Sequence, residues 1–408
     1  MNFFSELTEG LSIAWSAIRA NKLRSVLTTL GIVIGVVTVT LMGTAIEGLD
    51  RAFIHTISFI GADVLYVQTF EWGPHSEEEY IRMQKRHPLE LEYVATLERE
   101  MLLGRAFAPV SFTRRSLKHE KRSARGVTIL GSTDQLLLTG SIALADGRFI
   151  TPPEAAGGRP VCVIGSEVAT NLFPRESALG KKITIDQRPF EVIGVLEKQG
   201  SLFGNFDNQA IIPMPQYNAA FVHSHDVDQI QVKVNNVADL DNAKEELHSL
   251  MRRLRRLAPT DDDDFAINQQ EQVLAMVHRV TATIASVGLF ITGLSLFVGG
   301  IGIMNIMFVS VAERTREIGI RKAIGAKRRT ILLQFLIEAA TICLIGGAIA
   351  LSIAWPLTLL LQKFLPAVMS PTIVGVALAV SLVTGVLSGF FPAWRAARMN
   401  PVDALRNE

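Results

Sequence analysis

Four stretches of this chain carry almost no charge, and each is long enough to cross a lipid bilayer. Residues 25–46, 280–312 and 364–394 contain no charged side chain, and residues 330–362 contain only Glu338. An α-helix rises about 1.5 Å per residue, so roughly 20 apolar residues cover a hydrocarbon core of about 30 Å. The sequence therefore predicts transmembrane helices over 25–48, 330–362 and 372–394, and a stalk with a second transmembrane helix over 276–312.

The composition agrees with a folded membrane protein and excludes several other classes. Hydrophobic residues make up 49% of the 408 residues and charged residues 19%, which argues against a disordered or low-complexity chain. Lys and Arg number 40 against 39 Asp and Glu, a formal net charge of +1, so no overall basic field indicates nucleic-acid binding. The 2 cysteines are too few for a disulfide framework, and we expect no structural disulfide.

Basic residues near the helix ends predict the topology. They gather before the first helix, after the last one and in the connection 313–329, whereas the connection between helices three and four has Lys363 alone. By the positive-inside rule, both termini, the loop 313–329 and the tail 395–408 are cytoplasmic. The long segment 49–275 then lies outside the cell membrane, inserted between helices one and two. We expect a multi-pass protein of the inner (plasma) membrane, whose first apolar run stays as an anchor.

The first residues have a different pattern. Phe4, Leu7, Leu11 and Ile18 recur at helical spacing, which predicts an amphipathic helix over 1–24 on the cytoplasmic face. This helix either lies in the membrane interface or packs against the spanning helices of the same chain.

The segment 49–275 reads as an α+β domain. Short β-like runs, bounded by turn-forming residues, alternate with two helical patterns over 89–101 and 239–257. The runs predicted as strands are 64–68, 160–165, 182–185, 190–196, 210–214 and 230–234. This order suggests two lobes, one from about residue 60 to 130 and the other from the stretch that follows.

Catalytic and metal-binding patterns do not occur in this sequence. The Gly180-Lys181 pair lacks the leading glycine and the following Ser or Thr of a phosphate-binding loop, and no GxSxG, HExxH or CxxC pattern is present. The acidic run Asp261 to Asp264 lacks the ligand spacing of a calcium loop. We therefore expect a non-catalytic chain with no metal site and no cofactor of its own.

The loop 313–329 is the most informative stretch. It mixes acids with bases, and its apolar residues Ile318, Ile320, Ala323 and Ile324 predict a short helix with a face for a soluble partner. Positive charge alone would suffice for a loop that only fixes topology.

At this point the sequence resembles the MacB/FtsX-like permease family of ABC transporters. ERTREIGIRKAIGA (313–326) is similar to the family's coupling helix, and LADGRFITPPE (144–154) and PVCVIGSEVATNLF (160–173) to its extracytoplasmic core domain. Four more segments resemble the family and occur in the family's order along the chain: NKLRSVLTTLGIVIGV (21–36), GKKITIDQRPFEVIGVL (180–196), QFLIEA (334–339) and FPAWRAARMNPVDALR (391–406). MacB itself carries a fused ATPase domain, so we expect the ATPase here to be a separate polypeptide.

The resemblance implies a mechanism and a set of partners. Two copies of an ABC ATPase, which bind the ATP and Mg, would sit below a permease homodimer or a heterodimer with a related permease. Their closure would move the external domain by mechanotransmission and drive efflux or extraction of an amphipathic substrate. A periplasmic adaptor, an outer-membrane channel and membrane lipids are further partners that the family implies, and nucleic acid is not one. Two alternatives stay open: a lipoprotein-releasing permease, and an FtsX-like signalling protein that activates cell-wall hydrolases. The coupling residues by this resemblance are Glu313, Arg314, Arg316, Glu317, Ile318, Gly319, Arg321, Lys322, Ala323, Gly325 and Ala326.

Other residues bear on helix length and packing. The uncharged run before Glu313 is longer than a bilayer requires, so its excess should project outside as a stalk. Small residues predict close helix packing at Gly31, Gly35, Gly299, Gly300 and Gly302. Glu338, the one ionisable residue within a span, is expected to pair with an interfacial base such as Arg329 or to serve transport.

Overall fold

The structure is a computed structural model, and it describes residues 22–57, 61–140, 142–199, 206–221, 226–363 and 365–406. The amphipathic helix predicted over residues 1–24 lies outside this set, except for 22–24. The chain divides into two compact units. One is 52–278, and the other combines the described part of 1–51 with 279–408.

Helices alone build the unit that contains the chain ends. Its elements are α2 (Lys22–Ile57), α10 (Gln270–Glu313), α11 (Thr315–Ala323), α12 (Arg328–Leu361), α13 (Pro371–Arg398) and α14 (Pro401–Arg406), of which α2 and α10 extend into the other unit. Among the described residues, four helices are long and apolar enough to cross a membrane, which confirms that the four predicted apolar runs are long helices. Their apolar segments are Leu30–Phe53, Gln270–Glu313, Arg328–Leu361 and Pro371–Arg398.

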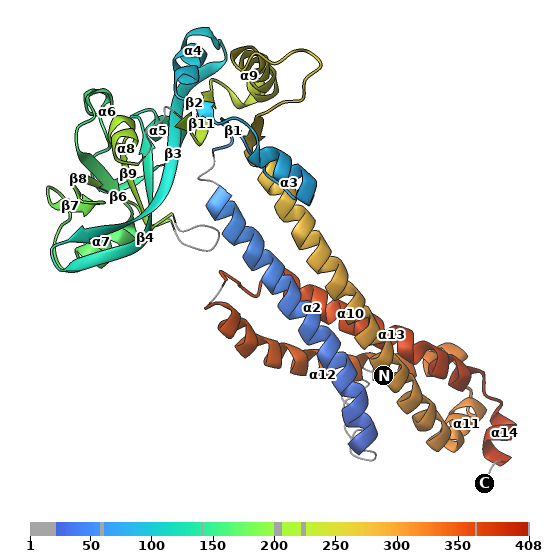
Figure 1. The fold of residues 1–408 in the computed structure, drawn as a ribbon. Helices are drawn as coiled ribbons and strands as arrows, with labels where there is room; N and C mark the ends of the chain where they lie inside the picture. Colours follow the sequence, from blue (N-terminus) through green and yellow to red (C-terminus); the bar gives the residue numbers. More distant parts are fainter. Residues whose placement is uncertain are drawn as a thin grey trace. The chain divides into compact units, whose positions relative to one another are not determined.

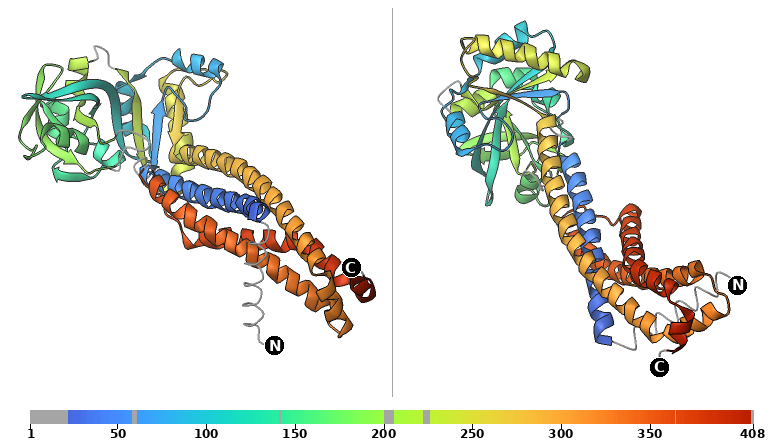
Figure 2. Two further views of the ribbon diagram at one scale, coloured as in Figure 1. Left: turned by 90° about the horizontal axis from the view of Figure 1, so that it is seen from below. Right: turned by 90° about the vertical axis from the view of Figure 1, so that its right-hand side faces the viewer.

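Glycines bring α2 and α10 into close contact, and the two helices run side by side in all three views (Figures 1 and 2). A Cβ atom on Gly31 would lie 2.9 Å from the Cα atom of Gly299, so neither position has room for a larger residue. Gly35 faces the side chain of Leu296. Between helices in a lipid bilayer the hydrophobic effect gives no driving force for association. Close approach of the backbones supplies instead the dispersion contacts that hold membrane helices together.

Two further predicted packing glycines lie on α10. Gly300 faces the hydroxyl of Ser388 on α13, and Gly302 is half-buried. The pair α12 and α13 packs in the same way, because Gly385 and Gly389 of α13 lie against Ala339 of α12. Small residues thus set the spacing of both helix pairs within this chain.

The unit 52–278 contains the strands. They are β1 (Val64–Gln68), β2 (Leu89–Glu90), β3 (Gly104–His119), β4 (Arg122–Ser132), β5 (Leu144–Gly147), β6 (Val161–Ile164), β7 (Lys182–Ile185), β8 (Arg188–Leu196), β9 (Gln209–Pro213), β10 (Asp226–Val227), β11 (Gln229–Val234) and β12 (Ala266–Gln269). The helices are α3 (Glu77–Gln84), α4 (Glu92–Glu100), α5 (Leu136–Thr139), α6 (Pro152–Gly157), α7 (Ser166–Leu172), α8 (Met214–Phe221), the 3₁₀ helix η2 (Val237–Asp239) and α9 (Leu240–Leu254).

Most of these strands form one 10-stranded sheet in the order β12-β1-β11-β3-β4-β9-β6-β8-β5, with β7 pairing both β3 and β8. The long strand β3 pairs β11 along its first half and β4 along its second, and so joins the two ends of the sheet (Figure 1). Strands from both sides of residue 130, where the sequence suggested a boundary between lobes, pair within this sheet. Strand β11 returns from late in the sequence to lie between β1 and β3, and β12 pairs with β1.

Buried and less buried side chains alternate along several strands that the sequence predicted. In β11 the residues Ile230, Val232 and Val234 are buried, and the residues between them are half-buried. They join a core with residues from β1, β6 and β8. The hairpin of β3 and β4 was not predicted, because its distal half carries the charged residues Arg114, Arg115 and Lys118 and buries only Leu117 of Arg114–His119.

One buried carboxylate anchors the loop before α6. Glu154 accepts two hydrogen bonds from the Arg148 guanidinium, at 2.7 and 2.8 Å, and one each from the hydroxyl and the backbone N–H of Thr151. These hydrogen bonds from Arg148 lower the pKa of Glu154 to about 2, although burial of the carboxylate acts in the opposite direction. Glu154 also caps α6 through Thr151, so its charge stabilises the helix N-terminus.

Replacing Glu154 with Gln should destabilise this unit by about 2–3 kcal/mol at neutral pH, because the folded state then loses the charged partner of Arg148. The pKa of Glu154 is lowered in the folded state, so its contribution is complete above the unfolded pKa of about 4.5 and disappears as pH falls through about 2. Thermal unfolding of the purified chain in detergent measures this, and the gap between wild type and Glu154→Gln should narrow below pH 4.5. Glu176→Gln, which removes an exposed carboxylate paired with Lys181, is the control and should change little.

Candidate functional site

The short helix α11 lies between the ends of two long apolar helices. Helix α10 ends at Glu313, Arg314 precedes α11, and α12 begins at Arg328. Gly325 has a φ of +100°, a backbone conformation that side chains with a Cβ rarely adopt, and it makes the turn into α12. The predicted coupling segment therefore contains one helix, Thr315–Ala323, set between two turns.

An ion pair joins the start of α11 to the interior of α12. The Arg314 guanidinium donates to both carboxylate oxygens of Glu338, at 3.2 and 3.4 Å. The Glu338 side chain is only 4% exposed, whereas that of Arg314 is 25% exposed. Glu338 pairs with an interfacial base as expected, but this base is Arg314 and not Arg329. Helix α10 ends one residue before Arg314, and this places the Arg314 side chain beside the carboxylate.

A lysine ties α11 to the end of α13. The Nζ of Lys322 donates to the backbone oxygens of Ala397 and Met399, at 2.7 and 2.6 Å. A cation in this position is favoured, because the last carbonyl groups of a helix lack intrahelical donors. Burial lowers the pKa of Lys322, and the nearby charge of Arg328 acts in the same direction.

A third contact reaches α12 one turn before Glu338. Arg321 donates to the Oε1 of Gln334 at 2.7 Å and also pairs with Glu317 on its own helix. Ile318 is 3% exposed and belongs to the same hydrophobic core as Ile331, Phe335 and Ala396. Helix α11 is thus fixed to α12 and α13 by two polar contacts, an ion pair and one apolar anchor, and it also contacts α14.

The predicted coupling residues fall on two faces of this segment. Ile318 and Gly319 are buried against the helices of the same chain, so the expectation that Ile318 contributes to a docking face is not supported. Ile320 and Ile324 are 46% and 81% exposed, large values for isoleucine. The exposed members of the predicted set are Glu313, Arg316, Glu317, Ala323 and Gly325, and the half-buried ones are Arg314, Arg321, Lys322 and Ala326.

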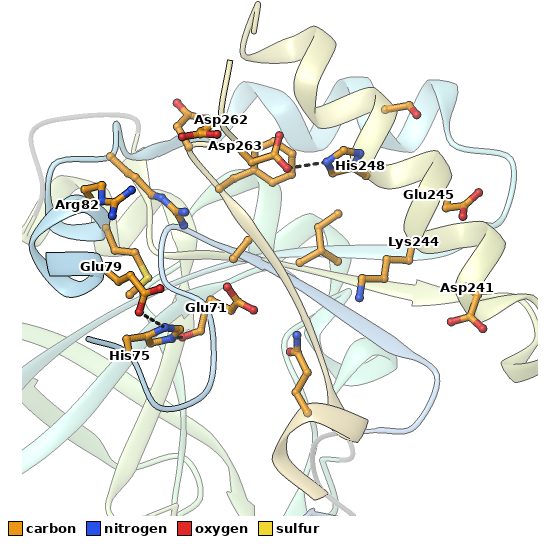
Figure 3. A pocket seen from close by; sticks show the side chains of 18 residues that line it. Glu71, His75, Glu79, Arg82, Asp241, Lys244, Glu245, His248, Asp262 and Asp263 are labelled. Atoms are coloured by element: carbon orange, nitrogen blue, oxygen red, sulfur yellow. Dashed lines mark hydrogen bonds and ion pairs between the residues drawn. The ribbon is translucent and has the colours of Figure 1, made fainter. Parts of the chain in front are cut away.

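A second candidate lies in the unit 52–278, where a hollow of about 1280 Å³ is lined by α3, α9 and the strand β12 (Figure 3). Two imidazole–carboxylate pairs line it: His248 contacts Asp263 at 2.7 Å and His75 lies 3.9 Å from Glu79. Burial of Asp263 acts to raise its pKa, but hydrogen bonds from His248 and Arg252 outweigh this effect and lower it.

The labelled side chains of this hollow are spread around its rim and do not converge on a point (Figure 3). Among the described residues, no group of three or more His, Cys, Asp or Glu is placed to hold a metal ion. The hollow therefore offers a charged surface, while the segment around α11 combines fixed polar contacts with exposed apolar residues.

Comparison with known proteins gives matches to two family models. Residues 25–250 match the MacB-like periplasmic core domain, and residues 289–401 match the FtsX-like permease C-terminal domain. The first match includes strands β1 to β11 of the unit 52–278, and the second includes α11, α12 and α13.

Three relatives align over nearly the whole chain. The macrolide export ATP-binding/permease protein MacB of Rhodopirellula baltica is 31% identical over 97% of this chain, and the pyoverdine export ATP-binding/permease protein PvdT of Pseudomonas syringae is 32% identical over 99%. The chain spans only 62% and 60% of the length of these two proteins. The ABC transporter permease YknZ of Bacillus subtilis is 32% identical over 98% of this chain, and the alignment covers 100% of YknZ.

Replacing Arg314 with Gln should destabilise the helical unit by about 2–3 kcal/mol, because it leaves the buried Glu338 carboxylate without its cation. The double variant Arg314→Gln/Glu338→Gln should cost less than the single one, since it removes the uncompensated charge as well. Thermal unfolding in detergent measures both. Arg316→Gln is the control, because Arg316 is exposed and has no ion-pair partner among the described residues. A double variant less stable than Arg314→Gln would contradict the importance of this pair.

Proposed function

This chain belongs to the MacB/FtsX-like family of ABC transporter permeases, and from that membership we propose that it couples ATP hydrolysis by a partner to motion of its unit 52–278. The observation that carries the proposal is α11. It is a short helix that, with the residue after it, exposes Ile320 and Ile324, and its other side is fixed to α12 and α13. Such a helix transfers a push on its exposed face to two membrane helices.

The ATPase is proposed to be a separate chain that grips this exposed face. One observation supports this part of the proposal. The relative YknZ, which aligns with this chain along its full length, is described as a permease, whereas the two longer relatives are described as ATP-binding/permease proteins. Two ATPase copies, with their ATP and Mg, would serve a pair of permeases.

The distribution of charge supports an orientation with α11 in the cytoplasm. Arg316, Arg321, Lys322 and the basic residues that start α12 gather beside one end of the membrane helices. The connection between α12 and α13 carries Lys363 alone. The unit 52–278 lies in the sequence between α2 and α10, and in this orientation it is extracytoplasmic.

Force would reach that unit through α10. This helix has 44 residues and is about 66 Å long, roughly twice the thickness of a bilayer core. It begins in the unit 52–278 and ends one residue before Arg314, so one continuous helix joins the proposed docking segment to the proposed moving unit.

A second permease copy is proposed to cover one side of α10. Seven of its apolar residues recur at alternating spacings of four and three, the pattern of a coiled-coil seam, and they are 41% to 60% exposed. They are Val280, Ile284, Val287, Ile291, Leu294, Val298 and Ile301. In the proposed orientation the N-terminal part of this stripe lies beyond the bilayer, where lipid cannot cover it, and this supports a dimer.

Export is the transport direction that the relatives support. The names of MacB and PvdT describe export of macrolides and of pyoverdine, two chemically different compounds, by proteins of similar identity to this chain. We therefore propose efflux or extraction of an amphipathic substrate. Neither macrolides nor pyoverdine is proposed as the substrate of this chain.

Replacing Ile324 with Asp should weaken the affinity for the ATPase partner about tenfold or more, because a carboxylate would be desolvated in an apolar contact. The measurement is the stimulation of ATPase activity in the reconstituted complex. Leu102→Asp is the matched control: Leu102 is 83% exposed, but it lies in the unit 52–278. Equal stimulation by both variants would remove the coupling role of α11.

Single cysteines should report the orientation. Glu120 is an exposed residue at the turn of the β3–β4 hairpin, and Lys327 is exposed just before α12. A membrane-impermeant maleimide should label Glu120→Cys in intact cells and Lys327→Cys only after permeabilisation. Background labelling should be low, since Cys162 and Cys343 are both buried. Labelling of Lys327→Cys in intact cells would invert the proposed topology.

A further inference from the structure

A cluster of aromatic rings and arginines lies where α13 and α10 meet, close to α11. Phe391 of α13 contacts Phe308 of α10 edge to face, with ring centroids 6.0 Å apart, and stacks on Trp394 at 6.1 Å. The Arg398 guanidinium lies 4.2 Å from the centre of the Trp394 ring, and that of Arg395 lies 5.9 Å from the centre of the Phe308 ring. The rings hold both guanidinium groups by cation–π contacts.

Neither arginine has an anionic partner in the described part of the chain. All the ion pairs found there involve other residues, and no carboxylate accepts a hydrogen bond from Arg395 or Arg398. Both arginines are exposed, as are Phe391 at 53% and Trp394 at 39%. The cluster therefore presents two fixed positive charges beside an open apolar surface.

We propose that Arg395 and Arg398, with the rings of Phe308, Phe391 and Trp394, bind the phosphodiester headgroup of an anionic phospholipid. The arginines suit the phosphate of such a lipid, and the aromatic rings suit its acyl chains. Guanidinium groups form charge-assisted hydrogen bonds with phosphate oxygens, and aromatic rings at the end of a membrane helix lie at the level where acyl chains meet headgroups.

The position of the cluster on the helix favours lipid over a soluble anion. Arg395 and Arg398 lie in the last turn of α13, after an apolar stretch that reaches back to Pro371. A membrane helix of this length ends at the headgroup region, so the exposed rings have lipid beside them. The helix dipole also favours cations here, but it does not supply an anion to pair with them.

The proposed lipid site sits on the same helix end as the contact that fixes α11. Lys322 donates to the backbone oxygens of Ala397 and Met399, which flank Arg398 in the sequence. A headgroup bound to Arg395 and Arg398 would therefore rest against the helix end that anchors the proposed coupling segment. This inference rests on the proposed function in one respect only: the proposed orientation places the bound lipid in the cytoplasmic leaflet.

Fluorescence of Trp394 can test the site directly. The full chain with Trp15, Trp72 and Trp355 changed to Phe is reconstituted in vesicles of equal parts phosphatidylglycerol and phosphatidylcholine, with bromine on the acyl chains of only one lipid at a time. Brominated phosphatidylglycerol should quench Trp394 more strongly than brominated phosphatidylcholine. Each arginine near an anionic surface gives roughly a fivefold preference, so the pair should give roughly a 25-fold local enrichment.

Arg395→Gln/Arg398→Gln should abolish this preference. Arg328→Gln/Arg329→Gln is the matched control, because it removes the same charge from two exposed arginines in the first turn of α12 and should leave the preference intact. Equal loss in both variants would show a general effect of basic charge and overturn the site. Loss of the preference on adding excess inorganic phosphate at constant ionic strength would also overturn it, in favour of a soluble anion.

Native mass spectrometry of the chain with all its tryptophans provides the second measurement. Wild type released from the same mixed vesicles should retain phosphatidylglycerol, and Arg395→Gln/Arg398→Gln should not. Retention unchanged by the double variant contradicts the proposal. Neither measurement requires ATP, so the lipid site and the coupling function can fail independently.

Discussion

The ion pair between Arg314 and Glu338 is the constraint on which the arrangement around α11 depends. A carboxylate that is 4% exposed inside an apolar helix is stable as an ion only with a cation beside it. That cation comes from the first residue after α10, so the end of α10 is held against the interior of α12. The pair adds to the contacts of Lys322, Arg321 and Ile318 that hold α11 against α12 and α13.

The other contacts of α11 are made by Lys322, Arg321 and Ile318, each with a different group. Together they explain why one face of the helix is buried and polar groups on it are paired, while the other face is exposed. Lys322 binds the carbonyl end of α13, Arg321 binds Gln334 of α12, and Ile318 fills the core between them. With its polar groups satisfied on the inner side, the helix is left with Ile320 and Ile324 exposed. Exposed isoleucines on a rigid support are what a partner surface can bind at low entropic cost, because this helix is already ordered before contact.

The local patterns of this sequence predicted more than its long-range pairings did. Four apolar runs, and the β-like runs of β1, β6, β7, β8, β9 and β11, were visible because burial imposes a period within each segment. The place of β11 between β1 and β3, and the partner of Glu338, depend on residues far apart in the chain. Sequence spacing favoured Arg329 for Glu338 because both lie on one helix. It could not show that the preceding helix brings Arg314 closer, nor that Ile318 turns inward.

The helix end at Ala397–Met399 places two different demands on α13. Its carbonyl groups need donors, which Lys322 supplies, and its arginines need anions, which the described part of the chain does not supply. If a lipid headgroup fills the second need, the proposed coupling segment is fixed on one side by protein and on the other by the membrane itself. A push on Ile320 or Ile324 would then work against both anchors, and the charge of the surrounding leaflet would affect how stiffly α13 resists it.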